Sequence, residues 1–596
     1  MFLFNPFEMI MVLFGLIFAY PWALILLPHE RRPRLLLSLT TLALSLGLLT
    51  WSMMLLAFVG ALSRLSVVLV MLLIFGAGVV CARSLLTFPR RSTARATLQQ
   101  VTHAAQRHPL GATAILITLG ITGLILLNAI YWPFGDDDAV SIYALHSLKI
   151  VQTDRFPTGE GLYEAYPMLL PLSYVYTYLI AGNINEYLAR IIPALLAAGT
   201  LGAAASLGEA LYNRRTGLLA MLLLALTPAF GRWAPTGYTD IPAAFFVTLA
   251  ALFAWRLAES GSSRDAVLAG ITVGLAAWTK NSALTLAGSL GIWLLLARWQ
   301  NRIKTQHIGL TLAALLVTAG PWYARNWSMF GLIVPKTVWT DRAVHTLSSA
   351  FPFLSFPDQF FIPGLFFTAG LIWATYESLT PRLLVAISQK GLWDTSTGQK
   401  SGIRAWLLLT FSLPFAAAWW WMASYDARFL LAVLPLIAVM GARAIDWGWN
   451  FAEQNLTLKP RWRLILQIIM LVLLLGLAFP SARKALIFKG DMLRQPLMTN
   501  TERHRIRLGP IYDVAVYLNE LPASGRVLSN SYFLPFHART VEVIVGGMPD
   551  LQALDRYDYL VYSAGRQPPA FVPPDAVELL TEIEGCRVYR VVKDQG

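Results

Sequence analysis

Long hydrophobic runs separated by short polar connections dominate the chain from residue 7 to residue 480. A helix that crosses the hydrocarbon core of a bilayer needs about 20 mostly apolar residues, and many of these runs reach or approach that length. The runs that we expect to cross are 7–27, 35–57, 64–80, 111–131, 186–207, 217–231, 240–257, 266–279, 282–299, 307–324, 360–378, 404–421, 427–447 and 464–480. The pattern therefore predicts a mainly α, polytopic helical membrane protein with about 14 spans.

After the last run, short apolar stretches alternate with polar ones, which is typical of strands and amphipathic helices. The expected strands begin at Arg526, Val541, Tyr559 and Arg587, and a helical pattern covers residues 511–521. The tail therefore predicts a small extramembrane α/β domain. Its sequence contains no phosphate-binding loop, dinucleotide fingerprint or metal-ligand cluster.

The composition supports a membrane protein. Of the 596 residues, 56% are hydrophobic and 13% are charged, against about 25% charged in average soluble domains. The net charge is +14, but the tail from Asp491 to Asp594 holds 11 Lys and Arg against 13 Asp and Glu. The basic excess therefore lies between the hydrophobic runs, where it sets topology, and no basic stripe with interleaved aromatic residues indicates nucleic-acid binding. Cys81 and Cys586 lie in different regions and predict no disulfide framework.

The positive-inside rule orients the spans. The strongly basic connections are His29–Arg34, Arg83–Arg107, Asn213–Arg215, Arg298–Lys304, Arg382–Arg404 and Lys459–Arg463. All six face the cytoplasm if both termini lie outside. The apolar segment 166–182 decides whether the number of crossings before the later loops is odd or even, and so on which side those loops lie. Because it contains Pro171 and several tyrosines, we interpret it as a juxtamembrane or re-entrant helix packed against protein. The alternative is a complete span, with one of the short runs not crossing.

The topology divides the chain into three parts. Residues 1–110 form additional N-terminal spans and a basic cytoplasmic loop, and residues 111–480 form the membrane core, with outer loops 132–165 and 325–359. Residues 481–596 form the extracytoplasmic α/β domain.

Three consecutive carboxylates, Asp136, Asp137 and Asp138, follow a span on its expected outer side. Adjacent acids repel one another, which raises the pKa of at least one of them unless a cation or metal ion offsets the charge. The alternative is a solvated helix N-terminus, where the helix dipole favours acids. The segment that follows, 139–149, is amphipathic and apolar enough to lie along the membrane surface.

Other charged residues stand at span ends on the same expected face. Asp240 opens a hydrophobic span, where a carboxylate either caps the helix or serves a site. Lys280, Arg325 and Arg428 also fall at span ends, and the alternative for each is snorkelling to lipid headgroups. Acids on one loop and cations at several helix ends suit a general base that works beside an anionic leaving group.

An ordered set of short motifs runs through residues 111–447. The set consists of Asp136–Tyr143 (DDDAVSIY), Tyr166–Pro167, Tyr187–Arg190, Arg215–Gly217, Tyr238–Pro242 (YTDIP), Gly274–Lys280 (GLAAWTK), Pro321–Asn326 (PWYARN) and Arg428 before Leu434–Pro435. In this order the motifs resemble the GT-C superfamily of integral-membrane glycosyltransferases, most closely the bacterial relatives of protein O-mannosyltransferases and of the aminoarabinose transferase of lipid A. The chain departs from the family pattern in two ways: three additional spans precede the usual first helix, and three aspartates stand where Asp-Glu is common.

The resemblance implies transfer of a sugar from a polyprenyl-phosphate-linked donor to an acceptor hydroxyl, with inversion, at the outer face of the plasma membrane. It implies that Asp138 or Asp137 is the general base, without deciding between them. It also implies that Arg428, with Lys280 or Arg325, stabilises the charge on the leaving phosphate.

The remaining candidates for substrate binding are Asp240, Asp136 and Tyr143. The expected partners are the lipid-linked donor, an acceptor lipid, glycan or protein, and the bilayer, without nucleic acid. The sequence identifies no required cofactor, although the three acids could hold a divalent cation and the basic residues could supply the same electrostatic effect. The C-terminal domain is expected to scaffold the enzyme or to contact the acceptor.

Three other functions compete with this one. A transporter or flippase is disfavoured because we find no inverted repeat or matched pair of broken helices, and because the acids fall in a loop. A scaffold or receptor acting through the tail would leave the elaborate membrane part unexplained. Within the enzyme class, a ligase or polymerase that uses diphosphate-linked oligosaccharides stays open.

Overall fold

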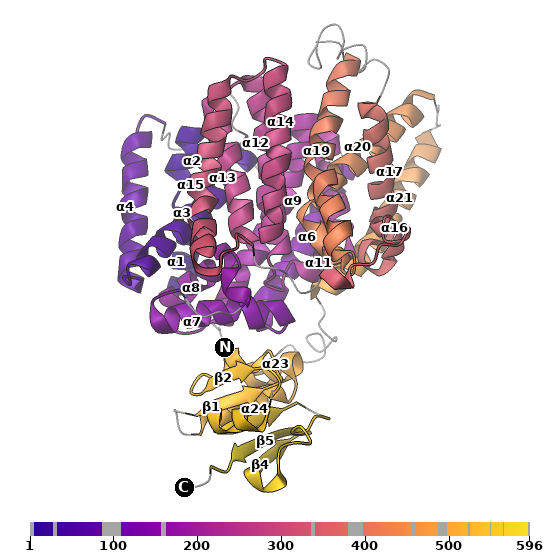
Figure 1. Ribbon diagram of the computed structural model, residues 1–596. Helices are drawn as coiled ribbons and strands as arrows, with labels where there is room; N and C mark the ends of the chain where they lie inside the picture. The colour runs from indigo at the N-terminus through magenta and orange to yellow at the C-terminus, as the bar shows by residue number, and fades with distance from the viewer. Residues whose placement is uncertain are drawn as a thin grey trace.

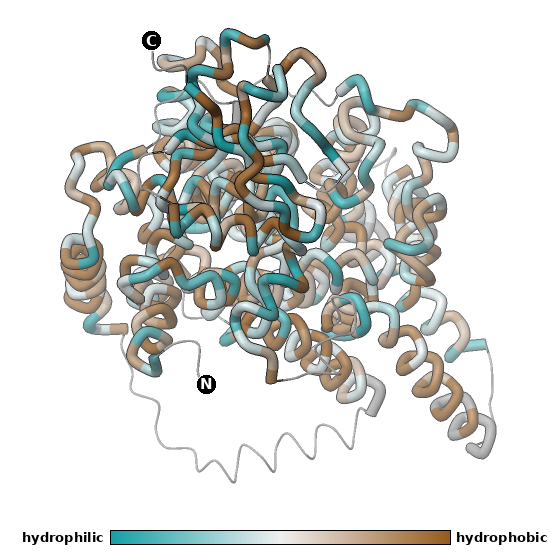
Figure 2. Tube along the Cα trace, turned by 90° about the horizontal axis from the view of Figure 1, so that it is seen from below, coloured by the Kyte–Doolittle hydropathy of each residue, from teal (hydrophilic) through white to brown (hydrophobic). Residues whose placement is uncertain are grey.

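A computed structural model describes residues 5–27, 33–85, 109–156, 162–334, 340–379, 397–455, 460–486, 497–521, 525–548, 550–563 and 565–593. Within these residues, a bundle of long helices lies against a small α/β domain formed by the end of the chain (Figure 1). Figure 2 shows that hydrophobic residues line the long helices, whereas hydrophilic residues are frequent in the small domain.

The bundle begins with α1 (Pro6–Ile17), α2 (Tyr20–Leu26), α3 (Arg34–Phe58), α4 (Arg64–Ala82), α6 (Pro109–Tyr131), α7 (Leu145–Thr153), α8 (Leu169–Ala181), α9 (Glu186–Leu211), α10 (Arg214–Leu226), α11 (Pro228–Trp233), α12 (Asp240–Ser260) and α13 (Ser263–Thr279). It continues with α14 (Thr285–Trp299), α15 (Thr305–Phe330), α16 (Pro352–Ser355), α17 (Pro357–Ser378), α19 (Thr397–Ala423), α20 (Leu434–Asn455) and α21 (Pro460–Leu486). In the described part of the chain, 11 helical segments are long and apolar enough to cross a membrane, and all of them coincide with expected spans. The other three expected spans also form helices, α10, α13 and α20, which are shorter or more polar. The multi-pass helical class is therefore confirmed, and the total of 14 spans stays a prediction.

The segment that decides the parity of the spans forms α8, a helix of 13 residues that is buried along most of its length. At 1.5 Å per residue it is about 20 Å long, whereas the hydrocarbon core is about 30 Å thick. Figure 1 shows α7 and α8 at the end of the bundle next to the small domain, and the link between α14 and α15 at the opposite end. That link includes Arg302 and Lys304, so basic charge and the small domain lie at opposite ends, as the predicted topology requires.

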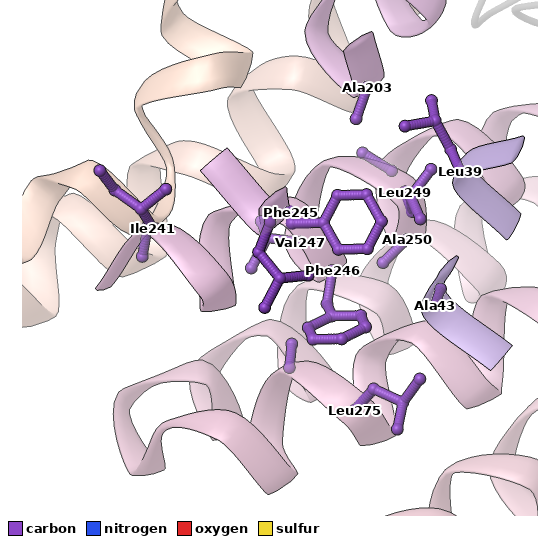
Figure 3. Packing of buried hydrophobic residues seen from close by; sticks show 14 of the residues in the cluster. Leu39, Ala43, Ala203, Ile241, Phe245, Phe246, Val247, Leu249, Ala250 and Leu275 are labelled. Carbon is purple, nitrogen blue, oxygen red and sulfur yellow. The ribbon is translucent and has the colours of Figure 1, made fainter. Parts of the chain in front are cut away.

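The centre of the bundle is α12, which is apolar on all sides and buried along nearly its whole length. A helix of this kind belongs in a protein interior. Phe245 and Phe246 pack there among Leu39 of α3, Ala203 of α9 and Leu275 of α13 (Figure 3). This packing fixes the position of Asp240, the first residue of α12.

The C-terminal domain is a five-stranded sheet with helices. Its elements are α23 (Asn500–Leu508), α24 (Ile511–Asn519), β1 (Arg526–Ser529), α25 (Leu534–His537), β2 (Glu542–Val545), β3 (Tyr559–Tyr562), β4 (Val577–Ile583) and β5 (Cys586–Val591). The strand order is β2-β1-β3-β5-β4, with β1 parallel to β2 and β3, and β5 antiparallel to β3 and β4. The sequence predicts every strand except β4, an edge strand with no fully buried residue. Neither cysteine forms a disulfide: Cys81 is exposed on the bundle and Cys586 is buried in the sheet.

The small domain packs directly onto the loop that carries the acidic triplet. Met498 packs against Tyr131 and Trp132 at the end of α6. Phe536 of α25 meets the ring of Phe134 edge-on, with the ring centroids 6.4 Å apart. The C-terminal domain therefore covers this loop and helps to fix its conformation.

Candidate active site

The acidic triplet ends the short loop that follows α6: Asp136 is the last loop residue, and Asp137 and Asp138 form a helical turn that leads into the π-helical turn η2 (Ala139–Ala144). Trp132 and Phe134 are completely buried and anchor the loop. The backbone amide of Phe134 donates a hydrogen bond of 3.0 Å to Oε2 of Glu186, the first residue of α9. Because a buried aromatic anchor and a buried hydrogen bond precede the acids, the loop holds them in a defined place.

Asp136 binds two arginines. Its Oδ1 lies 2.8 Å from Arg232 Nη2 and its Oδ2 lies 2.6 Å from Arg507 Nη2 of α23. Burial alone would raise the pKa of Asp136, but Arg507 and Arg232 outweigh it and hold the pKa below its usual value. Gly135 makes the approach possible, since a Cβ at this position would collide with the Arg507 side chain. Asp136 therefore joins the C-terminal domain to the loop.

Asp137 and Asp138 have different surroundings. The Asp137 side chain is exposed, and within the described residues its carboxylate has no hydrogen bond or ion pair. The Asp138 carboxylate is half-buried and lies 3.3 Å from Arg428 Nη2, and its backbone amide donates to the hydroxyl of Tyr238 at 3.2 Å. Burial raises the pKa of Asp138 against the opposing effect of Arg428, and a raised pKa is typical of a general base.

Asp240 and Lys280 form a buried ion pair close to Asp138. Asp240 starts α12, and Lys280 follows the last residue of α13. The neighbouring Thr239 shares a hydrogen bond of 2.9 Å with the hydroxyl of Tyr143, which is buried in η2. Tyr143 thus links the turn after the acidic loop to the start of α12.

Arg428 is the centre of the cluster. It lies in the 3₁₀ segment η6 (Ala427–Ala432), which precedes α20. Besides its contact with Asp138, its Nε lies 3.5 Å from Asp426 and 3.8 Å from Asp240. Three aromatic rings surround the guanidinium at 4.4–5.0 Å, those of Tyr238, Phe429 and Trp233.

The charges in this cluster nearly balance. The carboxylates of Asp138, Asp240 and Asp426 surround the two cations Arg428 and Lys280, so the five groups sum to one negative charge when all are ionised. An entering anion must therefore displace a carboxylate from a cation. The arrangement can bind an anionic group and release a carboxylate in the same step.

Arg325 takes part in another set of contacts. Its Nη1 donates to the carbonyl of Glu164 at 3.2 Å, and its guanidinium lies 4.4 Å from the ring of Trp322. The carboxylate whose charge acts on Arg325 is that of Glu164, which is not part of the triplet. The structure therefore brings together Asp138, Asp240, Lys280, Arg428 and Tyr143, and places Asp136 and Arg325 in neighbouring networks.

Sequence reasoning missed several residues of this region. Two of them, Arg232 and Arg507, bind Asp136. Two others, Asp426 and Trp233, flank Arg428. The fifth is Tyr238, whose hydroxyl contacts the loop. Tyr238 stands in the YTDIP motif and Asp426 two residues before Arg428, so both could have been found. Arg507 gives no local signal, because its partner is far away in the sequence.

The three acids of the loop do not gather around one point. In the part of the chain that the structure describes, one group of three metal-ligating residues has its ligand atoms within 4.8 Å of one another, and it consists of Glu186, His504 and His537. Two of its members belong to the C-terminal domain and the third to α9, which explains why the tail sequence alone shows no such cluster.

Known proteins share this architecture. Residues 166–324 match the model of the dolichyl-phosphate-mannose-protein mannosyltransferase family. ArnT from Cupriavidus metallidurans, solved with bound undecaprenyl phosphate, is 17% identical with a TM-score of 0.52, over 80% of this chain and 98% of that chain. The oligosaccharyltransferase of Archaeoglobus fulgidus in its apo form is 13% identical with a TM-score of 0.50, over 76% of this chain and 69% of that chain. No curated protein sequence matches the chain.

These findings confirm the resemblance seen in the sequence. The structural likeness gives the fold, that of the GT-C membrane proteins, and the family match gives the enzyme class, a glycosyltransferase. The matched segment includes Asp240 and Lys280 but neither the acidic triplet nor Arg428. The roles of the individual site residues therefore rest on the geometry described above.

Proposed function

We propose that this glycosyltransferase moves a sugar from a polyprenyl-phosphate-linked donor to an acceptor hydroxyl at the extracytoplasmic face of the plasma membrane, with inversion. The observation that carries the proposal is the 3.3 Å pair of Asp138 and Arg428, with Lys280 and Asp240 beside it. Such a transfer needs a base and a phosphate-binding cation held side by side. The undecaprenyl phosphate bound to ArnT, a protein with the same fold, supports this choice of donor.

Asp138 is the general base. As the acceptor oxygen attacks the anomeric carbon, its proton passes to the Asp138 carboxylate and the new glycosidic bond forms. The bond between the anomeric carbon and the phosphate oxygen breaks, and the polyprenyl phosphate leaves with that electron pair. Attack from the face opposite the leaving group inverts the configuration of the anomeric carbon.

Arg428 and Lys280 bind the donor phosphate and stabilise the charge that grows on it. Before the donor arrives, the two cations are paired with Asp138 and Asp240. A phosphate on Arg428 replaces Asp138 and leaves its carboxylate free to accept a proton. Asp240 keeps Lys280 and Arg428 in position from the fixed end of α12.

The orientation follows from charge. The loop of Asp138 lies at the end of the bundle that carries the C-terminal domain, away from the basic link between α14 and α15 (Figure 1). Basic connections face the cytoplasm, so the site opens on the outer side, where the phosphate of a lipid-linked donor lies at the membrane interface.

The test is sugar transfer by the purified full-length protein in liposomes. Radiolabelled polyprenyl-phosphate sugars are offered with lipid, glycan and peptide acceptors, and wild type is compared with Asp138→Asn and Asp137→Asn. We expect Asp138→Asn to lower the transfer rate by about 10²–10⁴-fold and Asp137→Asn to keep most of it. Asp513→Asn, in an exposed ion pair with Arg505, is the matched control. Normal transfer by both loop variants would exclude a base in this pair, and loss in Asp137→Asn alone would move the base to Asp137.

A further inference from the structure

A buried cluster of three metal-ligating side chains lies where the C-terminal domain meets the bundle. Glu186 begins α9, His504 belongs to α23, and His537 ends α25. Their relative exposures are 4%, 4% and 7%, and one ligand atom from each lies within 4.8 Å of the others. Glu186 and His504 are paired with each other, with Nε2 3.0 Å from Oε1, whereas His537 brings a further buried imidazole to the same point, and a buried polar group without a partner is unfavourable.

His504 is oriented as a metal ligand. Its Nδ1 lies 2.8 Å from the carbonyl oxygen of Asn500, which can only accept, so Nδ1 carries the proton of that bond. Its Nε2 donates to Oε1 of Glu186 at 3.0 Å, so a metal ion bound here would take the place of the Nε2 proton. The ring also stacks on Tyr512, with the centroids 4.7 Å apart and an interplanar angle of 19°. A backbone carbonyl on the second nitrogen is the usual support for a histidine that binds a metal ion.

His537 supplies a nitrogen with nothing to bind. Its Nε2 is buried and has no hydrogen-bond partner within the described residues. Oε2 of Glu186 accepts from the Phe134 amide and Oε1 accepts from His504, so Oε1 is the oxygen that a metal ion would take over.

We propose that Glu186, His504 and His537 bind one divalent transition-metal ion of the zinc type. Two imidazoles and one carboxylate favour Zn²⁺ over Mg²⁺ and Ca²⁺, which prefer oxygen ligands. With metal–ligand distances of about 2.0–2.2 Å, the ligand atoms move about 1 Å closer together than their present outer limit. The cluster lines a cavity of about 900 Å³, which leaves room for water as a fourth ligand.

The positive charge of Arg539 limits the affinity of this site for a metal cation. Arg539 lines the same cavity and lies near enough to Glu186 and His537 to affect both electrostatically. Its positive charge opposes a cation, so ligand type and geometry, not net charge, must provide the binding energy. Replacing it by the neutral Arg539→Gln is therefore expected to tighten metal binding.

The ion would pin the C-terminal domain to the bundle. It would join α9 to α23 and α25, and through Glu186 and the amide of Phe134 it would hold the loop that carries the acidic triplet. This is a positioning role for the domain interface, separate from the chemistry proposed at Asp138.

The test uses the full-length protein in detergent or nanodiscs, freed of metal by a chelator and titrated with Zn²⁺ or Co²⁺ alone. We expect about one equivalent to bind, a visible Co²⁺ spectrum of tetrahedral type, and a higher Tm on metal binding. Glu186→Gln and His537→Asn should weaken Zn²⁺ binding by more than about 100-fold, because even the loss of a supporting contact costs 10- to 100-fold. His345→Asn, at an exposed histidine whose ring lies against Trp420 and Trp421, should bind as wild type does.

His537→Cys keeps the result decisive if a variant folds poorly. It retains a ligand and should bind Co²⁺ with an additional sulfur-to-cobalt charge-transfer band that wild type lacks. Three outcomes would each contradict the proposed metal site. The first is that wild type binds no stoichiometric metal, and the second is that Glu186→Gln and His537→Asn bind it as well as wild type does. The third is that His537→Cys binds Co²⁺ without the new band. None of these readouts uses sugar transfer, so a failure of the metal-site proposal can be distinguished from a failure of the proposed function.

Discussion

The carboxylate of Asp136 lies 2.6 Å from the guanidinium of Arg507, although 371 residues separate them in the sequence. Both side chains are almost fully buried, with 6% and 4% exposed. One residue belongs to the acidic loop and the other to the C-terminal domain. The pair therefore joins the loop of the candidate base to a domain outside the membrane.

Breaking this pair should destabilise the junction. Arg507→Met leaves Asp136 with Arg232 alone, and removing one partner of a buried ion pair costs about 3–5 kcal/mol. We expect a lower Tm and faster proteolysis between the bundle and the C-terminal domain. The double variant Asp136→Asn, Arg507→Met should regain part of the loss, because no unpaired buried carboxylate remains. If the single variant is as stable as wild type, the pair does not hold the junction. Arg526→Met, whose partner Glu542 is exposed, is the control.

The sequence predicts this region only in part. Hydrophobic periodicity locates the long helices, and the YTDIP and GLAAWTK motifs locate Asp240 and Lys280, because the signals are local. The sequence does not distinguish the three aspartates, because they differ in partners that lie far away along the chain. Asp136 binds two arginines and Asp138 binds one. The sequence also does not predict which groups Arg325 contacts, namely Glu164 and Trp322, because a position at a helix end does not determine where a long side chain reaches, and a role of Arg325 at the phosphate site stays a prediction.

The pH dependence of transfer should report the raised pKa of Asp138. A base must be deprotonated, so kcat/KM should fall as pH drops through this pKa, at a pH above the ordinary aspartate value of about 4. Arg428 opposes the shift, and Arg428→Gln should therefore move the acid limb to still higher pH. Initial rates measured from pH 4 to pH 9 in buffers of constant ionic strength give the comparison. A limb at the ordinary aspartate value, unmoved in Arg428→Gln, would contradict the assignment of Asp138.

The proposed phosphate contact predicts a loss in kcat when Arg428 changes. Removing a donor that stabilises charge in the transition state costs about 10²–10³-fold in rate, so Arg428→Gln should lose this much. Arg428→Lys keeps the positive charge but lacks the planar guanidinium, so its kcat should lie between those of wild type and Arg428→Gln. Steady-state kinetics in liposomes separates kcat from KM. Arg443→Lys is the matched control, since Arg443 pairs with Glu377 outside the cluster at 3.1 Å. A change confined to KM would show that Arg428 binds donor without acting in the transition state.

The predicted topology has three informative positions. On a background without Cys81 and Cys586, single cysteines at Ser141, Arg214 and Ser563 probe η2, the start of α10 and the residue that follows β3. The basic connection at Arg214 should face the cytoplasm, whereas Ser141 and Ser563 lie on segments next to the acidic loop and in the C-terminal domain. We expect a membrane-impermeant maleimide to label 141 and 563 in intact cells and to label 214 only after the membrane is opened. Because α8 lies between 141 and 214 in the chain, labelling of 214 from outside would mean that α8 crosses the membrane after all. Labelling of 563 only in opened cells would instead place the C-terminal domain, and with it the candidate active site, in the cytoplasm.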